Sequence, residues 1–153
     1  MTGRETWEAL ALLLKAGRDG VVPVEGTSMN PFLWKGDRLH IRQAAPEQLR
    51  LGDLMAFRRA DALIVHRFVG RVRRDGRLWL RQKGDNLRGS SLVPVEDLVG
   101  RADLVMRGER TLDLTGRAAR WRNRVLGCRA WFAIALRGVA HSAARRCGIR
   151  RGQ

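Results

Sequence analysis

Residues 21 to 114 form a series of short apolar runs separated by turn residues, and this pattern restricts the fold more than any other part of the sequence. The clearest run is Arg77-Leu78-Trp79-Leu80-Arg81, in which polar and apolar side chains alternate as in a strand with one buried face. Asp75-Gly76, just before it, is a typical hairpin turn. We therefore expect a mainly antiparallel β core.

Helices are expected on both sides of this core. Glu5 to Ala16 has the spacing of a short amphipathic helix, ended by Gly17 and Gly20. Between the helices, a hairpin turn is expected over 70–76 and a polar connection over 44–50. The expected strands cover residues 21–25, 38–42, 54–58, 63–70, 77–81, 98–107 and 111–114.

After Gly116 the apolar period changes to that of a helix, with three- and four-residue spacing. The apolar positions are Trp121, Val125, Cys128, Phe132, Ala135 or Leu136, and Val139. This stripe could lie in a membrane interface or pack on the β core, and the sequence leaves both open. Nucleic-acid binding is disfavoured, because the aromatic residues share the stripe and do not alternate with the arginines.

Charge is concentrated in the same segment. Residues 117–153 contain ten arginines and no acidic residue, which is two-thirds of the formal net charge of +15. A basic block of this kind is typical of contact with an anionic partner, and we expect an anionic membrane surface. Solubility alone is the plainer explanation.

The length of 153 residues indicates one domain. We divide it into residues 1–116 and a basic helical extension, residues 117–153. No apolar run is long enough to cross a bilayer, and the first residues lack the basic start and cleavage site of a signal peptide. Cys128 and Cys147 form no metal pattern with His40, His66 or His141, so we expect free thiols, a reducing compartment and no metal or cofactor.

Ser28 stands at the apex of an expected turn in Val24-Glu25-Gly26-Thr27-Ser28-Met29-Asn30-Pro31. Gly26 lets the backbone bend and Pro31 fixes the exit. A nucleophilic serine needs such a position, because its hydroxyl must reach both a substrate and a base. A plain turn serine that bonds its own backbone is the alternative.

Two later stretches favour a nucleophilic Ser28 over a plain turn serine. His66 lies within the strand-like run 62–70, and Asp85 lies in Gln82-Lys83-Gly84-Asp85-Asn86. Together with the Gly36-Asp37 and Gly52-Asp53 pairs and the closing Val99-Gly100-Arg101, these motifs resemble the superfamily of signal peptidase I and the self-cleaving SOS-response repressors. The resemblance covers about residues 21–105, and its strength lies in the order of the motifs.

The resemblance implies a serine peptidase core with Ser28 as nucleophile. Where signal peptidase I and the repressors have a lysine base, this chain has His66, as in the branch found in the endoplasmic reticulum and archaea. An imidazole titrates near neutral pH and needs less burial than a lysine. A satisfied strand histidine is the structural alternative.

In that branch an aspartate of Lys-Gly-Asp-Asn lies near the dyad, which implies that Asp85 orients the imidazole; bonding to the turn backbone is its structural alternative. A second aspartate usually follows about six residues later, and here Ser91 stands in its place. Asp37 and Asp53 are expected to hold turns.

The oxyanion hole is expected to use the backbone N–H of Ser28. Thr27 is a candidate second donor, because Gly26 replaces the serine that many signal peptidases have there. Met29 and Pro31 complete the expected substrate-binding turn.

These residues favour a serine endopeptidase that cleaves a leader or precursor peptide, with small residues before the scissile bond. The chain shows neither the membrane anchor of signal peptidases nor space for a repressor's DNA-binding domain. We therefore expect a cytoplasmic protein, either free or peripheral at the inner membrane surface. The competing hypothesis is a catalytically inactive β module that binds a membrane or partner protein through its arginine-rich tail.

Overall fold

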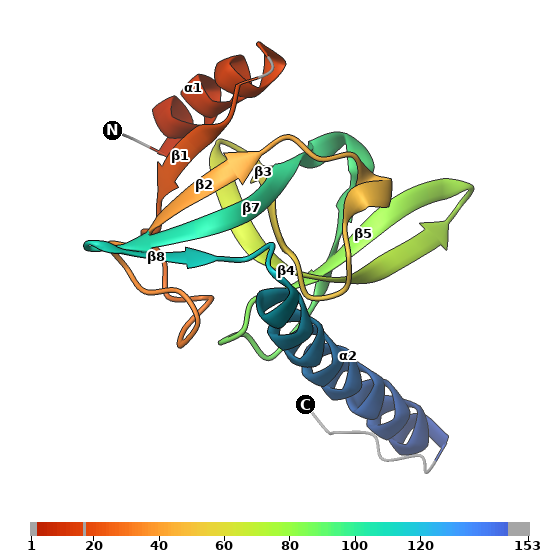
Figure 1. Ribbon diagram of the computed structural model, residues 1–153. Helices are drawn as coiled ribbons and strands as arrows, with labels where there is room; N and C mark the ends of the chain where they lie inside the picture. Colours follow the sequence, from red (N-terminus) through yellow and green to blue (C-terminus); the bar gives the residue numbers. More distant parts are fainter. Residues whose placement is uncertain (1–2, 17, 147–153) are drawn as a thin grey trace.

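The computed structural model describes residues 3–16 and 18–146, which form one antiparallel sheet with a helix near each end of the chain (Figure 1). In chain order the elements are α1 (Gly3–Lys15), β1 (Gly20–Pro23), β2 (Arg38–Arg42), η1 (Pro46–Gln48), β3 (Leu54–Arg59), β4 (Ala62–Arg74), β5 (Arg77–Lys83), β6 (Ser91–Pro94), η2 (Val95–Asp97), β7 (Leu98–Arg107), β8 (Arg110–Asp113) and α2 (Arg117–Arg146).

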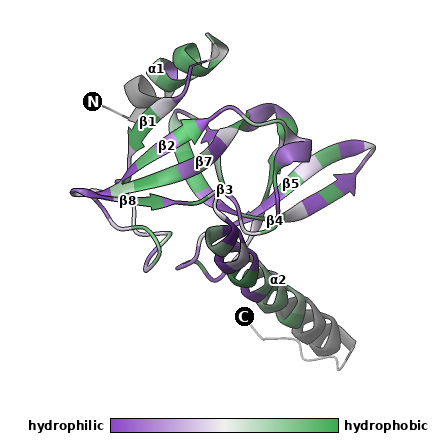
Figure 2. Ribbon diagram, viewed as in Figure 1, coloured by the Kyte–Doolittle hydropathy of each residue, from purple (hydrophilic) through white to green (hydrophobic). Residues whose placement is uncertain are grey.

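The strands lie in the order β1-β2-β7-β3-β4-β5-β6, with β8 added to β7, and every pairing is antiparallel. The sheet curls into a half-barrel (Figure 1). Apolar residues gather on α1 and on the strands around the core (Figure 2). The prediction of a mainly antiparallel β fold with a helix before and after the sheet is confirmed.

The strand predictions fail at two places. The structure continues β4 to Arg74, so the hairpin turn is Asp75-Gly76 alone and not the expected 70–76. Gly70, with φ of 142°, lies at a register shift in the β4–β5 ladder, so the glycine marks a bulge inside a strand. Strand β6 was not predicted, because four residues next to a turn carry little pattern.

Helix α1 closes one side of the half-barrel. Leu10 and Leu14 are buried and belong to the same apolar cluster as Val22, Leu39 and Ile41 from β1 and β2. Gly20 makes this approach possible, since a side chain there would overlap Leu10. Burial of each leucine contributes roughly 1.5–3 kcal/mol, which fixes the amphipathic helix on the sheet.

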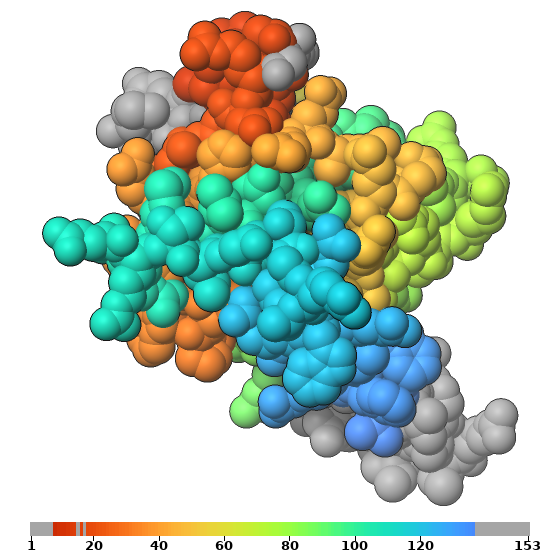
Figure 3. Space-filling view, viewed as in Figure 1, coloured from red at the N-terminus to blue at the C-terminus, as the bar shows by residue number. Residues whose placement is uncertain are grey.

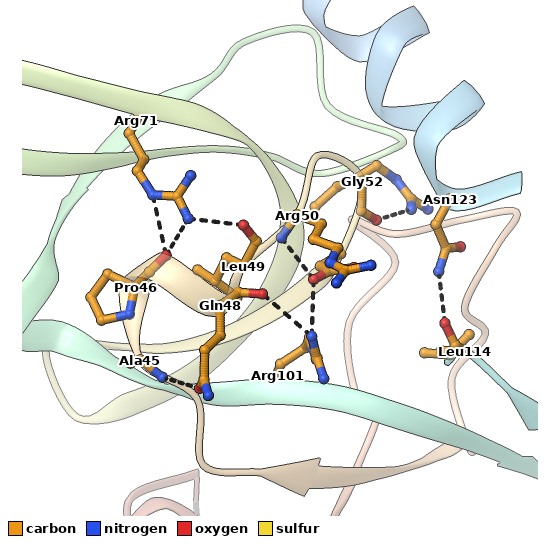
Figure 4. Close-up of polar contacts among 12 residues, drawn as sticks. Ala45, Pro46, Gln48, Leu49, Arg50, Gly52, Arg71, Arg101, Leu114 and Asn123 are labelled. Atoms are coloured by element: carbon orange, nitrogen blue, oxygen red, sulfur yellow. Dashed lines mark hydrogen bonds and ion pairs between the residues drawn. The ribbon is translucent and has the colours of Figure 1, made fainter. Parts of the chain in front are cut away.

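The connection between β2 and β3 is held by arginines from the sheet (Figure 4). Arg71 donates to the carbonyl oxygens of Pro46 and Leu49, at 2.5 and 2.9 Å from Nη2. Asp53 accepts a hydrogen bond from the Arg50 amide at 2.9 Å, and Asp37 does the same for the Trp34 amide. The prediction that these two aspartates hold turns is confirmed.

Helix α2 packs on the turn before β3 through its small and polar face. A Cβ at Gly127 would lie 2.7 Å from the amide nitrogen of Gly52, and Gly52 lies directly against the backbone of Asn123. Asn123 and Ala130, on the same side of α2, are also buried. The first turns of the helix are therefore part of the folded domain (Figure 3), although the helix then extends away from it (Figure 1).

The predicted apolar stripe faces away from this contact. Trp121 is 71% exposed, Phe132 60% and Leu136 69%, while Val125 and the neighbouring Trp131 are also exposed. We call these five residues the aromatic face of α2. The alternative in which this stripe packs on the β core is wrong, because the opposite face makes that contact. The side chain of Val139 lies outside the described residues.

We expect Gly52→Ala to destabilise the protein more than Gly36→Ala. Both glycines have nearly the same positive φ, 94° and 95°. The backbone strain of an alanine should therefore destabilise the fold by a similar amount, about 1 kcal/mol, at each position. Only at Gly52 does the added Cβ meet the backbone of α2, whereas at Gly36 it meets open space. The difference in unfolding free energy by urea denaturation should be about 1–3 kcal/mol. Equal losses would show that α2 is not docked at this turn.

Candidate active site

Ser28 lies in a loop that the backbone ties to the sheet. After β1 ends at Pro23, the amide of Val24 donates to the carbonyl of Asp37 at 2.8 Å, and Gly36 donates back to Val24 at 3.0 Å. Met29, next to the serine, is 2% exposed and belongs to the apolar core. A buried neighbour fixes the turn, while Ser28 itself remains partly accessible.

The Lys-Gly-Asp-Asn stretch is hydrogen-bonded to this turn. The amide of Asn86 donates to the carbonyl of Ser28 at 2.8 Å, and Asn86 Nδ2 donates to the carbonyl of Thr27 at 3.3 Å. Gly84 allows the approach, because a Cβ there would be 2.7 Å from the Ser28 oxygen. Lys83 Nζ donates to the carbonyl oxygens of Gly84 and Leu87. The motif therefore sets the position of the serine backbone.

His66 is the hydrogen-bond partner of the Ser28 hydroxyl. Its Nε2 lies 2.8 Å from Ser28 Oγ, and its Nδ1 lies 2.6 Å from Gln82 Oε1. An amide oxygen only accepts hydrogen bonds, so Nδ1 carries the proton and Nε2 presents its lone pair to the hydroxyl. The structure thus brings together the predicted Ser28 and His66 in the geometry of a nucleophile and its general base.

The environment keeps the imidazole neutral. Burial, chiefly, lowers the pKa of His66, and the nearby positive charges of Arg59 and Lys83 lower it further. The hydrogen bond to Gln82 and the charge of Asp85 oppose this shift. A neutral imidazole at pH 7 is the form that can accept a proton.

Asp85 is not among the hydrogen-bond partners of His66 in the described residues, contrary to the orienting role that the resemblance implied. Its two carboxylate oxygens accept hydrogen bonds from Arg67, at 2.8 Å from Nε and 2.6 Å from Nη2. Arg67 is fully buried, donates its Nη1 to the Gly52 carbonyl at 2.7 Å, and lies over the ring of Phe32. Both ring nitrogens of His66 are already occupied by Ser28 and Gln82, so Asp85 acts on the imidazole only through its charge.

The remaining predicted residues surround the serine. Thr27 is exposed, and its carbonyl accepts from Asn30 and Asn86. Pro31 is exposed and follows a cis peptide bond. Within the described part of the chain the amide of Ser28 donates to no acceptor, so it is available to an oxyanion. The roles of Thr27 and Pro31 stay predictions.

An apolar pocket of about 270 Å³ opens beside Ser28. One wall is the end of β1 and the following loop, from Val22 to Gly26, and the other is the start of β4, from Ala62 to Val65. Residues 62–66 of β4 pair with β3, but β5 joins β4 only from Arg67 onward. Within the described residues this stretch therefore has an unpaired backbone edge beside the serine.

Sequence reasoning missed three site residues: Gln82, Ser91 as its partner, and Arg67. Gln82 and Ser91 lie opposite each other in the β5–β6 ladder. A buried glutamine next to a motif carries no signal of its own. The alternation of β5 could have placed Gln82 on the buried face of Leu80, but not against His66.

No group of three or more His, Cys, Asp or Glu residues that could hold a metal ion occurs in the described residues. Cys128 is a free, half-buried thiol, and Cys147 lies outside the described residues. In the same described part, neither helix combines the length and apolar character needed to span a bilayer. No protein-family model matches the sequence.

We expect Asp85→Ala to lower the unfolding free energy by about 3–5 kcal/mol, because it leaves the fully buried Arg67 without its counter-ion. Asp97→Ala is the matched control. It removes the carboxylate from the half-exposed Arg58 and should cost less than about 1 kcal/mol. Urea denaturation of both variants measures this. An Asp85→Ala variant of normal stability would disprove the structural role of the pair.

Proposed function

We propose that this chain is a serine endopeptidase of the signal peptidase I type, with Ser28 as nucleophile and His66 as general base. The observation that carries the proposal is the 2.8 Å contact of Ser28 Oγ with His66 Nε2, while Nδ1 is held by a fixed acceptor. A serine in a plain turn has no need of a buried histidine whose tautomer suits proton transfer. The sequence motifs that resemble the histidine branch of that superfamily support the same assignment.

The geometry supports an acyl-transfer mechanism. Nε2 of His66 takes the hydroxyl proton as Ser28 Oγ forms a bond to the scissile carbonyl carbon. The amide of Ser28 donates to the developing oxyanion, and the imidazolium gives its proton to the leaving amine as the scissile C–N bond breaks. Water, deprotonated by the same imidazole, then attacks the acyl carbon; the bond to Ser28 Oγ breaks and Oγ takes the proton back from the imidazolium.

The pocket and the unpaired edge of β4 suit an extended peptide. A segment that adds to residues 62–66 would run past Ser28 with main-chain hydrogen bonds to β4. Its alternate side chains would enter the apolar pocket, whose volume of about 270 Å³ suits small or medium apolar groups. This favours a leader or precursor peptide with small apolar residues before the scissile bond.

Acylation by a fluorophosphonate probe tests the proposal against the inactive β module. Wild type should be labelled at Ser28, and Ser28→Ala should remain folded but unlabelled. His66→Ala should slow labelling by about 10²–10⁴-fold through loss of the general base. The labelling rate should rise with pH as His66 loses its proton, with a midpoint below the usual value of about 6.5 because burial lowers this pKa.

Three results would contradict this. Equal labelling of wild type and Ser28→Ala would show that Ser28 is not the nucleophile. Full activity of His66→Ala, together with loss of activity in Lys83→Ala, would make Lys83 the base. An unlabelled wild type would favour the inactive module.

We also propose that the protein binds peripherally to anionic membranes through the aromatic face of α2. Exposed aromatic residues on one side of a helix suit the interface of a bilayer. The exposed arginines of the same helix, Arg117, Arg120, Arg124 and Arg129, can contact lipid headgroups. The helix is docked by its opposite face, which leaves the aromatic face free to bind.

Co-sedimentation with vesicles measures this binding. We expect binding to vesicles of phosphatidylcholine mixed with phosphatidylglycerol, weaker binding at high salt and little to phosphatidylcholine alone. Trp121→Ser with Phe132→Ser should reduce binding more than tenfold, since each buried aromatic contributes roughly 1.5–3 kcal/mol. Leu112→Ser, at an exposed apolar residue on β8 outside the helix, is the control. Undiminished binding of the double variant would disprove this orientation.

A further inference from the structure

Four side chains form one hydrogen-bonded chain across three neighbouring strands. Ser28 contacts His66 of β4, His66 contacts Gln82 of β5, and the Nε2 of Gln82 donates to the hydroxyl of Ser91 in β6. Gln82 is only 4% exposed and Ser91 stands directly opposite it in the ladder. The proposed nucleophile is therefore connected to a buried amide rather than to a carboxylate.

The orientation of the Gln82 amide determines which of its ends faces the histidine. An amide side chain has a donor end and an acceptor end, and rotation by half a turn exchanges them. With Nε2 committed to Ser91, Oε1 points at His66 and can only accept. In the opposite orientation an N–H would face Nδ1, and the imidazole proton would move to Nε2, where it cannot serve as a base toward Ser28.

We propose that Gln82 is the positioning residue of this site: it holds His66 in the tautomer with the proton on Nδ1, through an amide whose Oε1 faces the imidazole and whose Nε2 donates to Ser91. This rests on the proposed peptidase function. The pair Gln82–Ser91 takes the position where an acid would be expected, since Asp85 is bound to Arg67 and Ser91 stands where the resemblance places a second aspartate.

A neutral orienting group has a functional consequence. A carboxylate beside Nδ1 stabilises the imidazolium, whereas an amide does so only weakly. The charged groups that act on the imidazole are Asp85 from the loop after β5, Lys83 from β5 and Arg59 from β3, and the two cations outnumber the one acid. The site should therefore keep its base unprotonated, and stay active, at a lower pH than an aspartate-containing site.

The decisive variants are Gln82→Met, which keeps the volume but removes the acceptor, and Gln82→Glu, which places a charge beside Nδ1. Gln43→Met, at an exposed glutamine, is the matched control. We expect Gln82→Met to lower the fluorophosphonate acylation rate by about 10- to 100-fold, the size of one buried hydrogen bond, with probe binding unchanged. Gln82→Glu should move the midpoint of the pH–rate profile upward.

Nitrogen-15 NMR of the His66 ring tests the hydrogen bond to Gln82 independently of catalysis, because it reports which ring nitrogen carries the proton. In the Ser28→Ala background the ring should be protonated on Nδ1, and Gln82→Met should add a population protonated on Nε2. If Gln82→Met fails to fold, Gln82→Glu keeps the proposal testable, because it retains the size of the side chain and an acceptor for Nδ1. That variant should keep the proton on Nδ1 and raise the midpoint of the pH–rate profile.

Three results would overturn the proposal: an unchanged acylation rate in Gln82→Met, an unchanged tautomer in that variant, or an unmoved pH profile in Gln82→Glu. Failure of the peptidase function looks different. In that case wild type is not acylated at Ser28, while the NMR spectra still show whether Gln82 sets the tautomer of His66.

Discussion

The buried pair of Arg67 and Asp85 is the interaction on which the geometry of the site depends. Arg67 has no exposed surface, and its three hydrogen-bonding nitrogens are used on Asp85 and on the Gly52 carbonyl. The pair therefore joins β4, the loop after β5 and the turn before β3, the turn on which α2 also docks. Leaving such a charge unpaired costs far more than a surface ion pair is worth, so these three segments are held in one arrangement.

This arrangement explains why the Lys-Gly-Asp-Asn stretch matters although its aspartate is hydrogen-bonded to Arg67 and not to His66. Asp85 anchors the loop, Gly84 allows the close approach, and Asn86 bonds the backbone on both sides of the Ser28 peptide. The serine is positioned by this loop, and the histidine by the ladder of β4. Each group thus reaches the other from a separate rigid element, which is what proton transfer over a single hydrogen bond requires.

Helix α2 divides its two faces between different environments. Gly127 and Asn123 are small or polar enough to lie against the Gly52 turn, so the helix begins as part of the domain. The larger apolar side chains, Trp121 and Phe132 among them, are left exposed on the other side. A periodicity argument assumes that the most apolar face is the buried one. Here close backbone packing through a glycine decided the orientation instead.

The sequence by itself determined the antiparallel β class, most strand positions and the two helices, because alternation and helical periodicity are local properties of the chain. The pairing of Ser28 with His66 was what the family resemblance implied. Only the tertiary structure decided the partners of Asp85 and Gln82. Both lie within a few residues of each other, and which one reaches the imidazole depends on strand register and on the competing charge of Arg67. The same holds for α2, since which of its faces meets the sheet depends on the shape of a turn seventy residues earlier in the chain.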